Sequence, residues 1–167
     1  VYSLRTSFNI AAVNMSLGGG SFNNQQDCDN LGILIKPVID NLRDADIATI
    51  ISSGNEDQCN GIGFPSCISS AIAVGATDDN DNEADFSNYD QLLDLFAPGV
   101  QVNSSVATGD SEYAEFNGTS MAAPHVAGAW AVIKDANGNR SVGTIRECLR
   151  LTGRGVDGRC VAAPPEP

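Results

Sequence analysis

The stretch from Phe116 to Ala129, FNGTSMAAPHVAGA, places a serine at the start of a run rich in alanine and valine. This run predicts a helix from about residue 119 to residue 135, with Thr119 or Ser120 capping its first turn. A hydroxyl at a helix N-terminus lies at the positive end of the helix dipole, which favours negative charge developing on its oxygen. Ser120 is therefore a candidate nucleophile.

A serine nucleophile needs a general base, and His125 is the only histidine in the sequence. Five residues of helix turn the chain by about 500° and raise it by roughly 7.5 Å, so the two side chains point to nearly opposite sides. A base must lie within about 3 Å of the hydroxyl that it deprotonates. We therefore interpret His125 as a packed helical histidine with a hydrogen-bonded ring, and we expect the base to come from elsewhere.

Two other motifs directly follow apolar segments that are typical of buried strands. The first, ISSGNEDQ, places Asn55 just past a strand, and ligands gather at this edge of a parallel sheet. An amide there can donate to the oxyanion of an acyl transfer, with the Ser120 N–H as a second donor. The second, SLGGG at residues 16–20, offers backbone groups that could bind a peptide as an added strand.

These motifs need a scaffold that brings strand ends together. Continuous apolar segments at residues 11–17, 47–52 and 71–76 predict a parallel sheet covered on both faces. LGILIKPVIDNL, residues 31–42, has apolar residues at helical spacing and predicts a helix that Pro37 kinks. The other predicted elements are polar loops at 21–30 and 55–66, an acidic loop at 77–85, a short strand within 92–100, a hairpin over 102–116 turning at 108–110, and a last helical turn at 146–151.

The composition limits the class of protein. A chain of 167 residues suits one domain with a real core. The net charge of -12 argues against nucleic acid as a partner, because phosphates require Lys and Arg. No stretch approaches about 18 uninterrupted apolar residues, so neither a transmembrane helix nor a membrane partner is predicted. The first ten residues lack the layout of a signal peptide, so we expect the chain to begin after processing or within a longer protein.

The five cysteines are dispersed through a polar chain and include no C-x-x-C pair, so we predict disulfides in a secreted protein and no zinc site. Cys148 and Cys160 bracket a glycine-rich loop and are the first predicted pair. Cys67 is expected to pair with Cys28 or Cys59, which leaves one thiol free or bound outside this chain. The alternative is a cytosolic protein with five reduced cysteines.

Together with the segments between them, these motifs resemble the subtilisin-like serine proteases, the subtilases. The three blocks of this resemblance are NMSLGG at 14–19 for one wall of the substrate cleft, SGN at 53–55 for the oxyanion hole, and GTSMAAPHVAG at 118–128 around the nucleophile. AIAVGATD at 71–78, FSN at 86–88 and LFAPGV at 95–100 match as well. The resemblance extends to about residue 152.

This resemblance implies an α/β fold, a subtilisin-like three-layer sandwich with a parallel sheet. The family also carries two upstream motifs, D-T/S-G with the triad aspartate and H-G-T with the catalytic histidine, and this chain has neither. We therefore expect residues 1–160 to be a partial peptidase domain that lacks the N-terminal strands, followed by a tail or linker at 161–167. Because the missing strands would bare an apolar sheet edge, we expect a marginal fragment unless the N-terminal half stays bound.

The resemblance also implies roles for individual residues. Ser120 would attack a peptide carbonyl, Asn55 and the Ser120 amide would stabilise the oxyanion, and a histidine of the missing half would act as base. The cleft and its primary pocket fall to Ser16, Leu17, Gly18, Ser53 and Gly54, with Thr119 and Met121 flanking the nucleophile. The partners would be a polypeptide substrate and the N-terminal half, and we expect the chain alone to be inactive.

Two other functions compete with this reading. One is a non-catalytic peptide-binding or interaction module derived from a subtilase, although the intact motifs at Asn55 and Ser120 argue against it. The other, an esterase with G-x-S-x-G, fails because Ala122 stands where that motif needs glycine. No cofactor is required, but subtilases often bind calcium as a structural ion. Its candidate ligands here are Asp78, Asp81 and Asp94, with a solvated acidic turn as the alternative.

Overall fold

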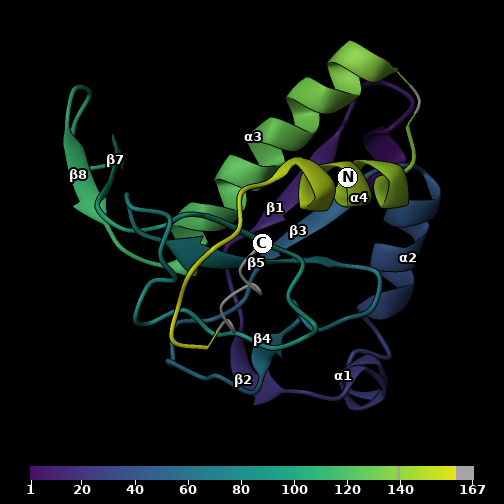
Figure 1. Ribbon diagram of the computed structural model, residues 1–167. Helices are drawn as coiled ribbons and strands as arrows, with labels where there is room; N and C mark the ends of the chain where they lie inside the picture. Colours follow the sequence, from purple (N-terminus) through teal and green to yellow (C-terminus); the bar gives the residue numbers. More distant parts are fainter. Residues whose placement is uncertain (139, 161–167) are drawn as a thin grey trace.

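A four-stranded parallel sheet forms the centre of the computed structural model, which describes residues 1–138 and 140–160 (Figure 1). The strands follow the order β1-β3-β5-β6, and every neighbouring pair is parallel. Their bounds are Ala12–Met15, Ala48–Ser52, Ile72–Thr77 and Leu95–Pro98. All residues of β3 and β5 are buried, which agrees with the continuous apolar segments that predicted them.

Helices cover both faces of this sheet, which gives the expected α/β layers. Helix α3, Thr119–Asn137, crosses one face and packs with α4, Val142–Thr152, around the fully buried Trp130 (Figure 1). The other face carries α2, Lys36–Asp44, whose Ile39 and Leu42 are buried. The predicted strands and the long helix are confirmed, and the last helical turn proves to be a full helix.

Two small antiparallel pairs lie outside the sheet. Strands β7, Val102–Ser105, and β8, Tyr113–Phe116, form the predicted hairpin, which extends away from the body of the molecule (Figure 1). Strands β2, Gly19–Phe22, and β4, Ile62–Phe64, pair with each other in segments that we expected to be loops. A short 3-10 turn, η1, covers Tyr2–Leu4.

The single helix predicted over residues 31–42 is wrong. Asn24 caps a separate helix α1, Gln25–Leu31, by accepting hydrogen bonds from the next turn, and α1 ends at Gly32. Pro37 lies in the first turn of α2, so it begins a helix and does not kink one. The apolar residues between the two helices, Ile33, Leu34 and Ile35, therefore face solvent. Leu31 at the end of α1 and Val38 in α2 are exposed as well.

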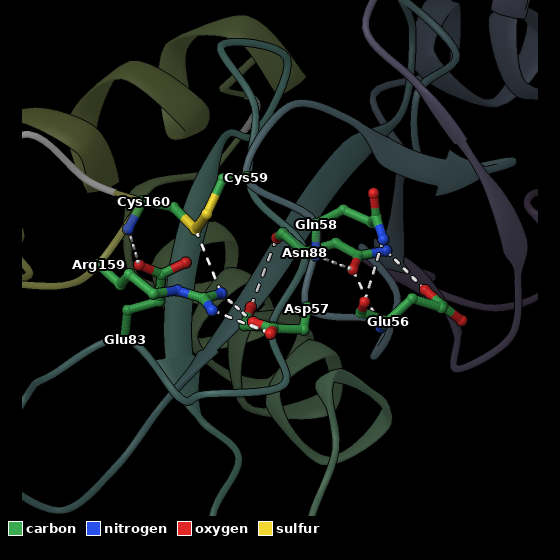
Figure 2. The surroundings of a disulfide bond; sticks show 9 residues. Glu56, Asp57, Gln58, Cys59, Glu83, Asn88, Arg159 and Cys160 are labelled. Atoms are coloured by element: carbon green, nitrogen blue, oxygen red, sulfur yellow. Dashed lines mark hydrogen bonds and ion pairs between the residues drawn. A yellow bond between two sulfur atoms is a disulfide. The ribbon is translucent and has the colours of Figure 1, made fainter.

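The disulfides differ in part from the prediction. Cys28 and Cys67 are paired as one of the two expected alternatives, and both are buried. The first predicted pair is wrong, because Cys160 bonds Cys59 (Figure 2). Cys148 is an exposed free thiol on α4. The segment after α4 runs back to the loop at residues 55–60, and this return carries Cys160 away from Cys148. None of the described helices is long and apolar enough to cross a membrane.

Candidate active site

Ser120 lies in the first turn of α3, as the sequence predicted. Gly118 precedes the helix, and its carbonyl accepts a hydrogen bond from Met121 N (2.9 Å). Ser120 is half-buried, and its hydroxyl has no hydrogen-bond partner among the described residues. The hydroxyl is therefore available at the positive end of a helix of 19 residues.

Asn55 reaches the same helix end from the carboxyl end of β3. Its Oδ1 accepts hydrogen bonds from Thr119 N (2.8 Å) and Thr119 Oγ1 (2.9 Å), and Thr119 Oγ1 in turn accepts one from Gly54 N (3.2 Å). Because both donors hold the amide oxygen, the Asn55 NH₂ group points away from them. It lies beside Gly118, where an added Cβ would come within 3.4 Å of Asn55 Nδ2. The exposed NH₂ can donate to an anion beside Ser120.

The segment that follows β1 forms the third part of the site. Ser16 Oγ donates to the carbonyl oxygen of Ser120 (2.7 Å), and Ser52 Oγ donates to Leu17 O (3.4 Å). A Cβ at Gly18, where φ is +153°, would lie 2.8 Å from Phe64 O, so this position requires glycine. The structure thus brings Ser16 and Gly54, which follow β1 and β3, to the start of α3, where Thr119 and Met121 lie. The other predicted cleft residues, Leu17, Gly18 and Ser53, lie against Ser52, Phe64 and Asn88.

Ser53 and Gly54 connect the Asn55 motif to a fully buried asparagine that sequence reasoning missed. Ser53 Oγ donates to Asn88 O (3.1 Å), while Asn88 Nδ2 donates to Ser53 O (3.3 Å). Gly54 has φ +113°, and a Cβ there would lie 2.2 Å from Asn88 Nδ2. The sequence assigns FSN at 86–88 only as a segment that matches the family. The asparagine within this segment is the feature that could have identified Asn88 as a site residue.

His125 is hydrogen-bonded as expected, but it is exposed and not packed. Its Nδ1 lies 2.8 Å from Met121 O, one turn back along the helix. His125 and Ser120 both line an open groove of about 380 Å³ beside β7, and no hydrogen bond joins them. The ring nitrogen nearest the backbone is thus engaged, and nothing in the described geometry makes His125 the base of Ser120.

Each of the three candidate calcium ligands interacts with other groups of the protein. Asp78 caps its own loop by accepting hydrogen bonds from Asn80 and Asn82, and Asp81 pairs with Arg154 (2.7 Å). Asp94 pairs with Arg146. Among the described residues, no group of three or more His, Cys, Asp or Glu side chains is arranged to hold a metal. The calcium site therefore stays a prediction.

Two of these carboxyl groups have shifted pKa values. The side-chain hydrogen bond from Asn82, followed by backbone donors, lowers the pKa of Asp78 below its ordinary value. Burial raises the pKa of Asp94, although the Ala73 N–H (2.8 Å) and Arg146 oppose the shift. An ion pair alone would lower this pKa, so the loss of hydration outweighs the attraction to Arg146. Neither group contacts Ser120.

Comparisons with known proteins agree with this geometry. The model of the Subtilase family matches residues 2–160. Alkaline elastase YaB of Bacillus sp. (strain YaB) is 48% identical over 106 residues, which are 64% of this chain and 27% of that protein. A cuticle-degrading serine protease of Arthrobotrys oligospora is 37% identical over 152 residues, 90% of this chain and 34% of that protein.

Solved structures give the same result. A protease of Pseudoalteromonas arctica PAMC 21717 superposes with a TM-score of 0.74 at 29% identity, over 87% of this chain and 44% of that one. A cold adapted subtilisin-like serine proteinase has a TM-score of 0.68 at 32% identity, over 84% and 47%. The chain therefore spans less than half the length of each of these relatives.

Proposed function

Because this chain belongs to the subtilase family, we propose that it carries the nucleophile and the oxyanion donor of a serine endopeptidase. The observation that supports this most is the pair of hydrogen bonds from Thr119 to Asn55 Oδ1, which leaves the Asn55 NH₂ group free beside Ser120. The relatives include an elastase and a cuticle-degrading serine protease, so a polypeptide is the substrate class that we propose.

The proposed reaction begins when Ser120 Oγ attacks the carbonyl carbon of a peptide. The hydroxyl proton passes to a histidine, while Asn55 Nδ2 and Ser120 N–H donate to the oxyanion that forms. The C–N bond then breaks, the histidine returns the proton to the leaving amine, and water hydrolyses the acyl-enzyme. Ser16, Leu17, Gly18, Ser53 and Gly54 would contact the substrate beside the scissile bond, with Thr119 and Met121 flanking Ser120.

The base must come from outside this chain. His125 is the only histidine of the sequence, and its Nδ1 lies against Met121 O. We propose that the triad histidine and aspartate belong to a further segment of the same domain, which would pair with the outer edge of β1. This strand pairs only with β3 in the described structure and leaves its other edge open. Without that segment Ser120 lacks its activation, and we expect the chain alone to be inactive.

The cysteine pairs support a secreted protein. Two disulfides join residues that are 39 and 101 positions apart, and such bonds persist in oxidising compartments. We therefore propose an extracellular location, where a polypeptide substrate and any structural calcium would both be available.

The experiment is labelling of Ser120 by a fluorophosphonate, read by intact mass, with the chain alone and with its upstream segment added. We expect labelling only in the mixture, none in Ser120→Ala, and a rate about 100-fold lower in Asn55→Ala because one oxyanion donor is lost. Asn60→Ala, an exposed asparagine of the same loop, is the control and should label normally. Labelling of the chain alone would show that it contains its own base. Binding of peptides without any labelling in the mixture would favour the non-catalytic module.

A further inference from the structure

Asn88 is a fully buried polar residue whose side chain uses its whole hydrogen-bonding capacity on one loop. Its Oδ1 accepts from Glu56 N (3.0 Å) and Gln58 N (3.1 Å). Its Nδ2 donates to Glu56 Oε2 (2.6 Å) and Ser53 O (3.3 Å). Figure 2 shows this amide between Glu56 and Gln58. A buried amide is expected to have its partners, but here every partner lies within six residues.

The hydrogen-bond partners of the Asn88 side chain flank Asn55 in the sequence. Ser53 comes before it, and Glu56 and Gln58 come after it. Glu56 Oε2 also accepts a hydrogen bond from Asn55 N (3.0 Å), so the carboxylate links the Asn88 side chain directly to the Asn55 backbone. Asn88 N donates to Gly54 O (3.1 Å) as well. Asn88 therefore fixes the backbone of Asn55 without contacting its side chain or Ser120.

The far end of the same loop is held by different means. Cys59 forms the disulfide with Cys160, and Asp57 pairs with both terminal nitrogens of Arg159 (Figure 2). These bonds anchor residues 57–59 to the segment after α4, but they begin two residues past Asn55. The backbone next to Asn55 is held by Asn88, by the carboxylate of Glu56, and by Thr119 Oγ1, which accepts a hydrogen bond from Gly54 N.

We propose that Asn88 is a positioning residue for Asn55. Its amide and the Glu56 carboxylate together hold the Asn55 NH₂ group where it can donate to an oxyanion on the substrate of Ser120. This inference rests on the proposed function for its catalytic meaning, but the placement of Asn55 can be measured without any reaction. The reporter is the Thr119 N–H, which donates to Asn55 Oδ1. Its chemical shift and its rate of exchange with solvent should change whenever Asn55 moves.

The hydrogen bond from Asn88 Nδ2 to Glu56 Oε2 allows a specific test. Asn88→Asp keeps the size of the side chain and the oxygen that accepts from Glu56 N and Gln58 N. It replaces the Nδ2 donor by an oxygen, 2.6 Å from Glu56 Oε2, so two carboxylates must face each other. In acid the new carboxyl can take up a proton and donate to Glu56 Oε2 again, while Glu56 Oε2 keeps its hydrogen bond from Asn55 N. A residue that only fills space would not respond to this change of pH.

The first measurement is the Thr119 amide signal in proton–nitrogen NMR spectra of the chain, with the Ile145 amide in α4 as internal reference. In Asn88→Ala we expect Thr119 to exchange with solvent about tenfold faster, in line with one weakened hydrogen bond, while Ile145 is unchanged. Asn88→Asp should displace the Thr119 shift near neutral pH. The shift should return in acid, because the new carboxyl, once protonated, can donate to Glu56 Oε2 as the Asn88 amide does.

The second measurement is the fluorophosphonate labelling rate of Ser120 with the upstream segment present. Asn88→Ala should lower the maximal rate about tenfold and leave the probe concentration for half-maximal rate unchanged, since the donor and not the binding site is disturbed. Asn60→Ala is the matched control for both measurements.

The outcomes separate the two proposals. If Thr119 keeps its shift and exchange rate in Asn88→Ala and Asn88→Asp while only thermal stability falls, Asn88 is a structural residue and the inference is wrong. Failure of acid to return the Thr119 shift of Asn88→Asp would overturn it as well, and this comparison remains available if Asn88→Ala does not fold. If wild-type Ser120 is never labelled, the proposed function fails, but the Thr119 signals still decide the role of Asn88.

Discussion

The two sides of the candidate site are held in very different ways. The loop at residues 53–60, which carries Asn55, is fixed by a buried amide, a disulfide and a two-bond ion pair. The segment at residues 16–20 is exposed over most of its length, and its side chains make one hydrogen bond to the start of α3. The loop that carries Asn55 is thus held by side chains, whereas the segment at 16–20 is held mainly through its backbone, by the pairing of Gly19 with β4 and the hydrogen bond from Ser52 to Leu17 O.

The positions of the strands explain this difference. The loop at 53–60 follows β3, which has neighbours on both sides, and it is hydrogen-bonded to Phe86 O and to the buried Asn88. The segment at 16–20 follows β1, which has β3 on one side only. A segment at an open sheet edge can adapt to a peptide or to a further strand, whereas an oxyanion donor must already be in place when charge develops.

Removing the disulfide of the loop at 53–60 should have the largest effect. Cys59→Ser opens a link across 101 residues, and the chain-entropy argument gives a loss of about 4 kcal/mol or more in the free energy of unfolding. Urea unfolding measures this loss. Cys148→Ser, which changes an exposed free thiol, is the control and should stay within about 0.5 kcal/mol of wild type. Equal stability of the two variants would mean that the disulfide does not hold the loop.

A methyl group at Gly54 should have the next largest effect. Gly54→Ala combines an unfavourable positive φ with a contact of 2.2 Å to Asn88 Nδ2, and we expect a loss of roughly 3 kcal/mol. Gly19→Ala tests the other side of the site, where an added Cβ meets nothing within 4 Å, and it should cost less than about 1 kcal/mol. Thermal and urea unfolding of the two variants compare the sides directly, and similar losses would contradict the contrast drawn between them.

The dependence of stability on pH should arise from neither side of the candidate site but from Asp94, at the opposite end of the sheet. Asp94 accepts from Ala73 N near the start of β5, and burial raises the pKa of its carboxyl. The folded chain therefore binds this proton more tightly than the unfolded chain. The resulting stability is fully present below the ordinary pKa of 3.8 and is lost as pH rises through the higher folded value.

Asp94→Asn should remove this part of the pH dependence. Urea unfolding of wild type and variant at a series of pH values measures it as the difference between the two curves. The Thr119 amide shift should be the same in both proteins, since Asp94 is remote from Asn55. The free energy of unfolding of wild type minus that of Asp94→Asn should fall as pH rises. A rise of this difference with pH would contradict the raised pKa of Asp94.

The smallest effect is expected at Ser16. Ser16→Ala removes an exposed hydrogen bond to Ser120 O, and we expect a loss below about 1 kcal/mol. Thermal unfolding measures it, and Ser21→Ala in β2 is an exposed serine control. A loss as large as that of Gly54→Ala would show that the segment at 16–20 is held as firmly as the loop at 53–60.

The sequence predicted those parts of the molecule whose pattern is local. Continuous apolar segments marked β1, β3 and β5, and the turn at residues 108–110 marked the β7–β8 hairpin. The motifs around Ser120 and Asn55 were placed correctly because parallel strands end at one edge of a sheet. The grouping of Ser120 with Asn55 thus follows from the sequence alone.

The parts that could not be predicted depend on contacts between distant residues. Apolar spacing suggested one helix over residues 31–42, but Asn24 and Gly32 end the first helix early and tertiary packing buries only its C-terminal continuation. The Cys59–Cys160 bond depends on where the segment after α4 returns, which no local pattern specifies. Asn88 gains its role from a loop that lies 30 or more residues earlier in the chain.

Cys148 is a suitable position for attaching a single dye to this chain. It is the one cysteine of five that forms no disulfide, it is exposed on α4, and it is not among the residues that line the groove at Ser120. A maleimide dye should therefore attach to a single position without touching either pair of bonded cysteines. A dye placed there would report by energy transfer when a second labelled segment docks, independently of any activity measurement.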